Sequence, residues 1–228
     1  MTDVLLFGAF PYISVVLLLV ISIQRYRNNA FTISSLSSQF LETRKLFWGS
    51  LPFHLGILLL FVGHLIGFLV PRSVIAFSAT PLRLIILEVT GLTAGLLFAW
   101  GLVLLMVRRF TSKRLRPVTT VVDYVVYAML VFQSVTGLYV SLYLRWGSAW
   151  YVHVVVPYLW SLFAMKPQIE LMASVPWMAR LHVLGAFLLF SVFAFTRLMH
   201  VLVAPVPYLW RRTQLVVWNR RRGRGAEG

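Results

Sequence analysis

Four of the five histidines lie inside long apolar stretches of the chain. His54 and His64 are ten residues apart in PFHLGILLLFVGHLIGFLV, and His182 and His200 are eighteen residues apart in RLHVLGAFLLFSVFAFTRLMHVLV. An ionisable side chain within a membrane-spanning helix is costly and is a functional candidate by default. On a helix these spacings amount to roughly 15 and 27 Å, so no single metal ion can take all four imidazoles. The arrangement therefore favours two sites, each with two histidines.

The absence of cysteine limits what these sites can hold. Disulfides, Cys-ligated iron–sulfur clusters and haem attached through a C-x-x-C-H motif are all excluded. Zinc prefers four protein ligands, or three and a water, whereas two imidazoles in an aromatic and aliphatic surrounding suit the axial positions of haem b. Glycines that flank the histidines would let a flat porphyrin approach, although they also serve close helix packing: Gly56, Gly63, Gly67 and Gly185.

Two arginines lie close to histidines in the last apolar stretch. Arg180 precedes His182 by two residues, and Arg197 precedes His200 by three. Each arginine is a candidate contact for haem propionates, and each equally fits a long cationic side chain that reaches the water at a helix end.

The helices that must position these residues follow from composition. Hydrophobic residues make up 60% of the 228 residues and charged residues 12%, against roughly 45–50% and 25% in soluble domains. About 20 apolar residues in a helix span the hydrocarbon core of a bilayer. We predict an all-α membrane protein with five transmembrane helices, at residues 4–23, 51–70, 84–107, 121–144 and 181–203.

Basic residues predict the orientation of these spans. Fifteen of the 21 Lys and Arg residues lie in the two loops after spans 1 and 3 and in the tail, and five lie on the other side. Short cytoplasmic loops collect Lys and Arg, so the N-terminus is predicted outside and the C-terminus in the cytoplasm. The net charge of +15 then reflects topology and lipid head groups rather than nucleic-acid binding. Residues 1–203 form the membrane domain, and residues 204–228 a basic cytoplasmic tail.

This orientation pairs the histidines by depth. Span 2 runs outward and span 5 inward, so His54 and His200 lie near the cytoplasmic face, and His64 and His182 lie nearer the outer face. The axial separations of about 15 and 27 Å do not match between straight parallel helices. Tilting span 5 by about 40° shortens its projection to about 21 Å. The two histidines of each pair would then differ in depth by about 3 Å, so the axis between the two ligands would be inclined at each site.

Three further features lie near the ends of the spans. Asp123 follows Thr119 and Thr120 and is predicted as a first-turn acid of span 4. Glu88, one turn inside span 3, could be a functional carboxylate, but a residue at this position is more often paired or reaches the interface, as we predict here. The apolar segment AWYVHVVVPYLWSLFAM is about 17 residues long and has Pro157 at its centre. We predict that it lies in the outer interface with His153 as an ordinary interfacial histidine, because a sixth crossing would carry the Arg-rich tail outside.

At these motifs the sequence resembles the gamma subunit of respiratory nitrate reductase, a dihaem cytochrome b. The resemblance covers SSQFLETRK, FHLGILLLFVGHLIGFLVP, VTTVVDYVVYAMLVFQSVTGL and RLHVLGAFLLFSVFAFTRLMHVLVAPVPYLWRRTQLV. It assigns His54 and His200 to a proximal, cytoplasmic haem and His64 and His182 to a distal, outer haem. The sequence departs from the family in the outer connection and at Ala194 and Ala204, which replace Pro and Ser.

The resemblance also implies a reaction and partners. A membrane quinol would be oxidised near the distal haem in a bacterial or archaeal cytoplasmic membrane. Electrons would pass through the proximal haem to a cytoplasmic iron–sulfur subunit and a molybdenum catalytic subunit. Arg83 occupies the approximate place of a quinol-site lysine of the family, and Gly63 with His64 would form the haem edge of that site. Tyrosines of the outer connection and His153 are weaker candidates.

Two other functions fit the same residues. A related cytochrome b subunit could feed another cytoplasmic reductase, such as one that acts on sulfur compounds or disulfides. A haem-free transporter or membrane anchor could use the histidines for proton relay, and it would lack the visible absorption bands of low-spin haem.

Overall fold

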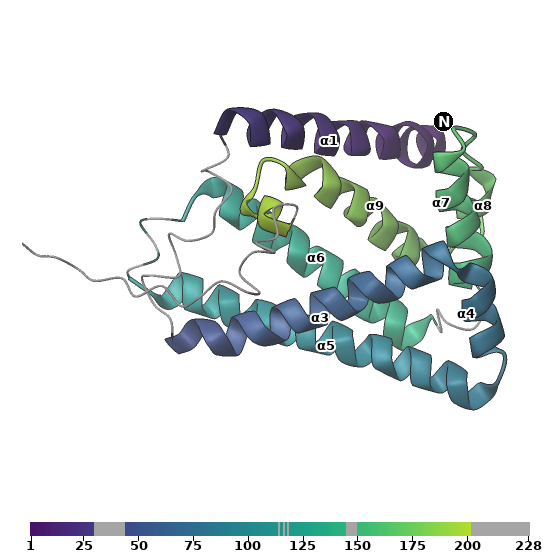
Figure 1. Cartoon of the computed structure of the whole chain (residues 1–228), viewed down its shortest axis with the longest axis horizontal. Coiled ribbons are helices and arrows are strands. Elements are labelled where there is room, and N and C mark those ends of the chain that lie inside the picture. Colours follow the sequence, from purple (N-terminus) through teal and green to yellow (C-terminus); the bar gives the residue numbers. More distant parts are fainter. Residues whose placement is uncertain (30–43, 114, 116, 118, 145–149, 202–228) are drawn as a thin grey trace, which may run out of the picture.

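The structure is a computed structural model that describes residues 1–29, 44–113, 115, 117, 119–144 and 150–201. All regular structure in these ranges is helical (Figure 1). The predicted tail, residues 204–228, lies outside the described residues, as do residues 30–43 and 145–149 in the loops.

Among the described residues, four helices are long and apolar enough to cross a membrane. The first begins as a π-helix, Val4–Ala9, and continues as α1, Phe10–Asn29. The others are α3 (Arg44–Leu69), α5 (Pro81–Thr111) and α6 (Val121–Tyr143). The first helix and α5 contain the whole of their predicted spans and extend beyond them. Helix α3 begins before predicted span 2 and ends one residue short of it, and α6 begins with predicted span 4 and ends one residue short of it.

The fifth predicted span is wrong as one continuous helix over residues 181–203. Helix α9 covers Trp177–Phe193, and its 17 residues fall below the length of the four longer helices. After a turn, a 3-10 helix labelled η5 covers Arg197–Val201 and carries His200. His182 and His200 therefore do not share one straight axis, and the estimate of about 27 Å between them, made for a continuous helix, does not apply.

Local sequence sets several helix ends. Thr120 and Asp123 form a reciprocal capping box at the start of α6, which confirms the prediction for Asp123. Proline at the first position begins both α5 and the short helix α4, Pro71–Ser78, which the sequence analysis treated as loop.

Short helices run across one end of the bundle. The outer apolar segment forms a π-helical turn, Tyr151–Val155 (η4), and α7, Val156–Phe163, followed by α8, Glu170–Ala173. In Figure 1 α4, α7 and α8 lie crosswise to α1 and α3, at the end of the bundle where the N-terminus also lies. This end is the predicted outer end, and the interfacial position of the segment stays a prediction.

Tyrosine and tryptophan side chains bind this segment to the long helices. The Tyr158 hydroxyl donates to the Phe7 carbonyl at 2.7 Å, and the Tyr12 hydroxyl donates to the Leu162 carbonyl at 3.0 Å. The Trp160 indole donates to the Phe68 carbonyl at 3.0 Å, near the end of α3 where backbone carbonyls lack helical partners.

The long helices pack in the order α3, α5, α6, α9 and α1. Helices α3 and α5 approach most closely at two glycines, because a Cβ at Gly56 would overlap the backbone of Phe98 and a Cβ at Gly101 would overlap the backbone of Phe53. Gly56 therefore serves helix packing. Helices α3 and α9, which carry three of the four histidines, are not close packing neighbours, and their histidines lie between them.

Candidate metal centres

The structure brings the four histidines together in two pairs. The ring centres of His54 and His200 are 6.1 Å apart with an angle of 68° between the ring planes. The ring centres of His64 and His182 are 6.4 Å apart with an angle of 37°. We call the first the inner pair and the second the outer pair, after the ends of the bundle at which they are predicted to lie.

These separations fit one metal ion between two axial imidazoles. A metal–nitrogen bond of about 2.0 Å and about 1.1 Å from the nitrogen to the ring centre, counted twice, give roughly 6.2 Å. Across the described part of the chain, no group of three or more His, Asp or Glu residues could hold a metal ion. Further ligands of an ion at either pair would have to come from a bound group, as porphyrin nitrogens do for haem iron.

Hydrogen bonds at Nδ1 leave Nε2 of three histidines available to a metal. Nδ1 of His54 contacts the Ser50 carbonyl at 2.8 Å, and Nδ1 of His64 contacts the Leu60 carbonyl at 2.7 Å. Nδ1 of His200 contacts the Arg197 carbonyl at 2.7 Å. A carbonyl oxygen can only accept, so each Nδ1 carries the proton and each Nε2 keeps its lone pair.

His182 is held differently, by a side chain of α6. Its Nδ1 lies 3.0 Å from the Thr136 hydroxyl, and that hydroxyl donates to the Phe132 carbonyl at 2.9 Å. The hydroxyl therefore accepts from Nδ1, which again leaves Nε2 of His182 without the proton. A Cβ at Gly137 would lie 2.9 Å from the His182 ring, so a glycine is needed beside this imidazole.

Gln133 adds a polar group beside the outer pair. Its amide nitrogen donates to the His182 carbonyl at 3.1 Å and lies 3.4 Å from Nε2 of His182. Its Oε1 atom is buried and has no hydrogen-bond partner among the described residues. A buried, unsatisfied oxygen is costly, so Gln133 marks this place as one where a further group is expected.

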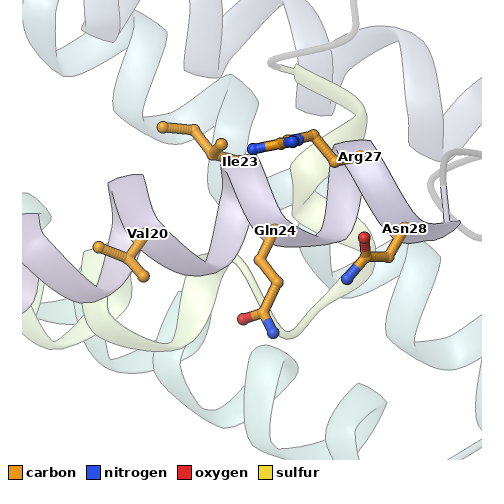
Figure 2. A pocket seen from close by; sticks show the side chains of 5 residues that line it. All are labelled: Val20, Ile23, Gln24, Arg27 and Asn28. Atoms are coloured by element: carbon orange, nitrogen blue, oxygen red, sulfur yellow. The ribbon is translucent and has the colours of Figure 1, made fainter.

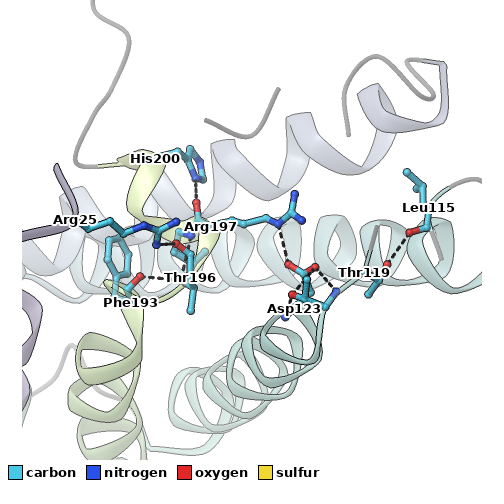
Figure 3. Close-up of polar contacts among 10 residues, drawn as sticks. Arg25, Leu115, Thr119, Asp123, Phe193, Thr196, Arg197 and His200 are labelled. Carbon is cyan, nitrogen blue, oxygen red and sulfur yellow. Dashed lines mark hydrogen bonds and ion pairs between the residues drawn. The ribbon is translucent and has the colours of Figure 1, made fainter. Parts of the chain in front are cut away.

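Both predicted propionate contacts are paired with carboxylates in the protein chain. Arg180 forms an ion pair with Asp3 and lies 5.0 Å from the centre of the Phe7 ring. Arg197 forms an ion pair with Asp123, with 3.1 Å between Nε and Oδ1 (Figure 3). The role of each arginine toward propionates stays a prediction.

At the predicted outer end, Tyr151 contacts His64. Its hydroxyl donates to the His64 carbonyl at 3.0 Å, and the two rings meet edge to face with centres 5.9 Å apart. Burial raises the pKa of Tyr151 from 10.0 to about 12, so its hydroxyl keeps its proton at neutral pH. Nothing in the sequence separates Tyr151 from the other tyrosines of the outer connection.

The two predicted quinol-site residues lie in open positions. Arg83 is exposed near the start of α5, with its guanidinium 5.8 Å from the centre of the Phe77 ring. At Gly63 an added Cβ would meet nothing within 4 Å. By contrast, a Cβ at Gly67 would contact Tyr151 and a Cβ at Gly185 would contact Gln133, so these two glycines are needed for protein packing. His153 is exposed, in keeping with an ordinary interfacial histidine.

Two surface hollows lie among the described residues, and neither is lined by a histidine of the two pairs. The larger, about 350 Å³, is a surface hollow on α1 alone, lined by Val20, Ile23, Gln24, Arg27 and Asn28 (Figure 2). The smaller, about 220 Å³, lies between the N-terminal helix and α9 and includes Arg180.

The chain matches the family described as the nitrate reductase gamma subunit over residues 3–219. The chain belongs to this family. It is 32% identical over 225 residues to the nitrate reductase gamma chain of Bacillus subtilis (strain 168), covering 97% of this chain and 100% of that one. It is 31% identical to the respiratory nitrate reductase 2 gamma chain of Escherichia coli (strain K12), covering 94% of this chain and 96% of that one.

A third relative is longer than a gamma subunit alone. The nitrate reductase-like protein NarX of Mycobacterium tuberculosis (strain ATCC 25618 / H37Rv) is 35% identical over 229 residues, which cover 93% of this chain and 35% of NarX. The resemblance inferred from the motifs is confirmed. As a gamma subunit, the chain is a membrane component of respiratory nitrate reductase and is not its nitrate-reducing subunit.

Proposed function

We propose that this gamma subunit binds two b haems, one between His54 and His200 and one between His64 and His182. The observation that carries the proposal is the separation of the paired rings, 6.1 and 6.4 Å, which suits one iron between two imidazoles. The hydrogen bonds at all four Nδ1 atoms support it, because they set the tautomer that presents Nε2 as a ligand.

When bound, haem supplies reversible one-electron transfer, which lets the two electrons of a quinol leave one at a time. The chain's own residues hold and orient this group. His54 and His64 are fixed on a single helix, whereas His182 and His200 come from α9 and the separate η5. His54 and His64 are exposed on α3, whereas His182 and His200 are partly buried, so a group bound between the paired rings would cover the two exposed imidazoles.

We place quinol oxidation at the predicted outer end. Gly63 leaves open space beside His64, and Arg83 supplies a cation on the neighbouring α5. The Tyr151 hydroxyl donates to the carbonyl of the same histidine and stays protonated. An apolar slot with a few fixed polar groups is the usual form of a site for such a ligand.

Electrons are proposed to leave at the opposite, cytoplasmic end, toward an iron–sulfur subunit and a molybdenum catalytic subunit. Fifteen basic residues on this side favour docking of soluble subunits and binding of anionic membrane lipids. The predicted fifth crossing of a bacterial or archaeal membrane, with the N-terminus outside, is part of the same proposal.

Spectra of the purified chain test the haem sites. We expect two low-spin b haems per chain in the reduced-minus-oxidised spectrum. His54→Ala and His200→Ala should each remove one and the same haem, and His64→Ala and His182→Ala should each remove the other. His153→Ala is the matched control, because His153 is exposed and belongs to neither pair, and it should keep both haems.

Three outcomes would contradict parts of the proposal. A wild-type chain without the visible bands of haem would support a haem-free transporter or anchor instead. Loss of the same haem in the His54 and His64 variants, with retention of that haem in the His200 variant, would contradict the pairing. A complete dihaem spectrum with electron delivery to a reductase other than nitrate reductase would contradict the proposed electron acceptor and leave the haem sites in place.

A further inference from the structure

The ligand His200 depends on contacts from outside its own helix. It lies on the five-residue η5, which is separated from α9 by a turn. An isolated 3-10 turn of this length has few internal hydrogen bonds and is not stable by itself. Other parts of the chain must therefore hold η5 at the place where His200 meets His54.

Arg197 connects His200 to a neighbouring helix. Its carbonyl accepts the hydrogen bond from Nδ1 of His200 at 2.7 Å, so Arg197 fixes the tautomer of the ligand. Its Nε atom pairs with Oδ1 of Asp123 at 3.1 Å. Figure 3 shows the three residues in sequence, from the imidazole through Arg197 to the carboxylate.

Asp123 is itself fixed at the start of α6. Its other oxygen, Oδ2, accepts from the Thr120 backbone N–H at 2.9 Å and from the Thr120 hydroxyl at 3.2 Å. The Asp123 side chain is 8% exposed, while that of Arg197 is 36% exposed. A buried carboxylate needs a partner of opposite charge, and Arg197 provides it.

Arg25 holds the turn that precedes η5. Its Nη1 atom donates to the Ala194 carbonyl at 2.9 Å and to the Thr196 carbonyl at 3.0 Å. The Thr196 hydroxyl donates to the Phe193 carbonyl at 2.8 Å and accepts from the Leu198 N–H at 3.1 Å. The turn and η5 are thus bound to α1 on one side and to α6 on the other.

We propose that Asp123 is a positioning residue for the inner haem ligand, acting on His200 through the side chain and the carbonyl of Arg197. This rests on the proposed function, because it assumes that His54 and His200 hold a haem. It also gives Arg197 a role different from a direct contact with haem propionates. Asp123 does not touch the haem in this proposal, and its effect reaches only the inner site.

Asp123→Asn tests the proposal, because it removes the charge and keeps an oxygen for the Thr120 N–H. We expect a lower occupancy of the inner haem, a shifted midpoint potential and a shifted low-spin EPR signal, which reports the angle between the imidazole planes. The outer haem serves as the internal reference and should not change. Asp123→Glu should restore the inner haem, because Glu is also favoured at this position of a capping box.

Two control variants separate positioning from general stability. Thr120→Ala breaks the capping box and removes one of the two hydrogen bonds to Oδ2. It leaves the bond from the backbone N–H and the ion pair of Asp123 with Arg197, so the inner haem should keep its EPR signal and its midpoint potential. Asp3→Asn breaks the ion pair with Arg180 at the other end of the bundle, and it should also leave the inner haem unchanged.

The failure of this inference differs from the failure of the proposed function. A wild-type chain without haem contradicts the proposed function. Two haems in the wild type and an unchanged inner haem in Asp123→Asn contradict the positioning role alone. Loss of the inner haem in Arg197→Gln but not in Asp123→Asn would overturn it in favour of direct propionate binding by Arg197.

Discussion

The hydrogen bond at Nδ1 is the residue-scale feature that distinguishes His182 from the other three histidines. Nδ1 of each of those three contacts a backbone carbonyl of its own helix, and Nδ1 of His54 also lies 3.1 Å from the Ser50 hydroxyl of that helix, whereas Nδ1 of His182 bonds to the hydroxyl of Thr136 on a different helix, α6. The partner at Nδ1 alters how strongly an imidazole donates electrons to a metal. The outer site can therefore be adjusted by one side chain without moving a helix.

Thr136→Val should change the outer haem alone. Valine has nearly the same shape and removes the oxygen that accepts from His182, so the imidazole becomes a weaker electron donor and the midpoint potential of the outer haem should rise. Potentiometry of the purified chain measures this. Thr93→Val is the control, because the Thr93 hydroxyl bonds only to the Val89 carbonyl of its own helix. A shift confined to the inner haem would contradict the assignment of Thr136 to the outer site.

Residue types and spacing sufficed to predict the histidine pairs, but not their surroundings. Two histidines on each of two opposed spans can pair by depth in only one way. Thr136, Gln133 and Tyr151 carry no such signal, because their positions depend on the rotation of α6 and on the folding of the outer segment. Only the tertiary structure brings them beside the histidines.

At the scale of elements, the end of α9 is the main departure from the sequence prediction. The run FAFTRLMH contains neither proline nor glycine, so apolar content alone predicts a helix that continues to residue 203. The helix ends at Phe193 in the structure, and Arg25 donates hydrogen bonds to the carbonyls of Ala194 and Thr196 just beyond this end. This interaction spans more than 160 residues of sequence and leaves no local pattern. The sequence prediction reconciled the mismatch in axial separations with a tilt of a straight span 5, whereas in the structure α9 ends at Phe193 and His200 lies on the separate η5.

The close contact of α3 and α5 gives an element-scale prediction. Gly101→Ala should lower the unfolding temperature in detergent and the occupancy of both haems, because a Cβ there overlaps the backbone of α3, which carries His54 and His64. Overpacking of this kind costs about 1–3 kcal/mol. Gly95→Ala on the same helix is the control, since its Cβ would meet only a methyl end of Leu138. Equal stability of the two variants would show that α3 and α5 are less closely packed than described.

At the scale of the whole molecule, charge and fold assign different roles to the two ends. The end with α4, α7 and α8 is the one to which five basic residues were assigned, and the opposite side was assigned fifteen. Composition predicted the all-helical class and five spans, of which four are long helices in the structure. They could not predict α4 or the crosswise path of α7, because short helices at a bundle end depend on docking contacts such as that of Trp160 with Phe68.

The proposed placement of quinol oxidation at the outer end predicts charge movement across the membrane. Protons released by the quinol would leave outside, while electrons and protons used for nitrate reduction would be taken up inside. Each charge moved against a potential of 100 mV costs about 2.3 kcal/mol, which the redox reaction must supply. In right-side-out vesicles that hold the complete enzyme, a soluble quinol and nitrate should acidify the external medium, and an uncoupler should abolish the gradient.

Arg83→Ala locates this reaction within the molecule. Removing the cation at the start of α5 should slow haem reduction by the quinol and the external acidification together, by about tenfold if one charge-assisted hydrogen bond of roughly 1.5 kcal/mol is lost. Reoxidation by nitrate in the assembled enzyme should stay unchanged, because that step occurs at the opposite end. Normal reduction by quinol in this variant would remove Arg83 from the site. Nitrate reduction by quinol without external acidification would instead place quinol oxidation at the cytoplasmic end, because the protons released there would be consumed by nitrate reduction in the same compartment.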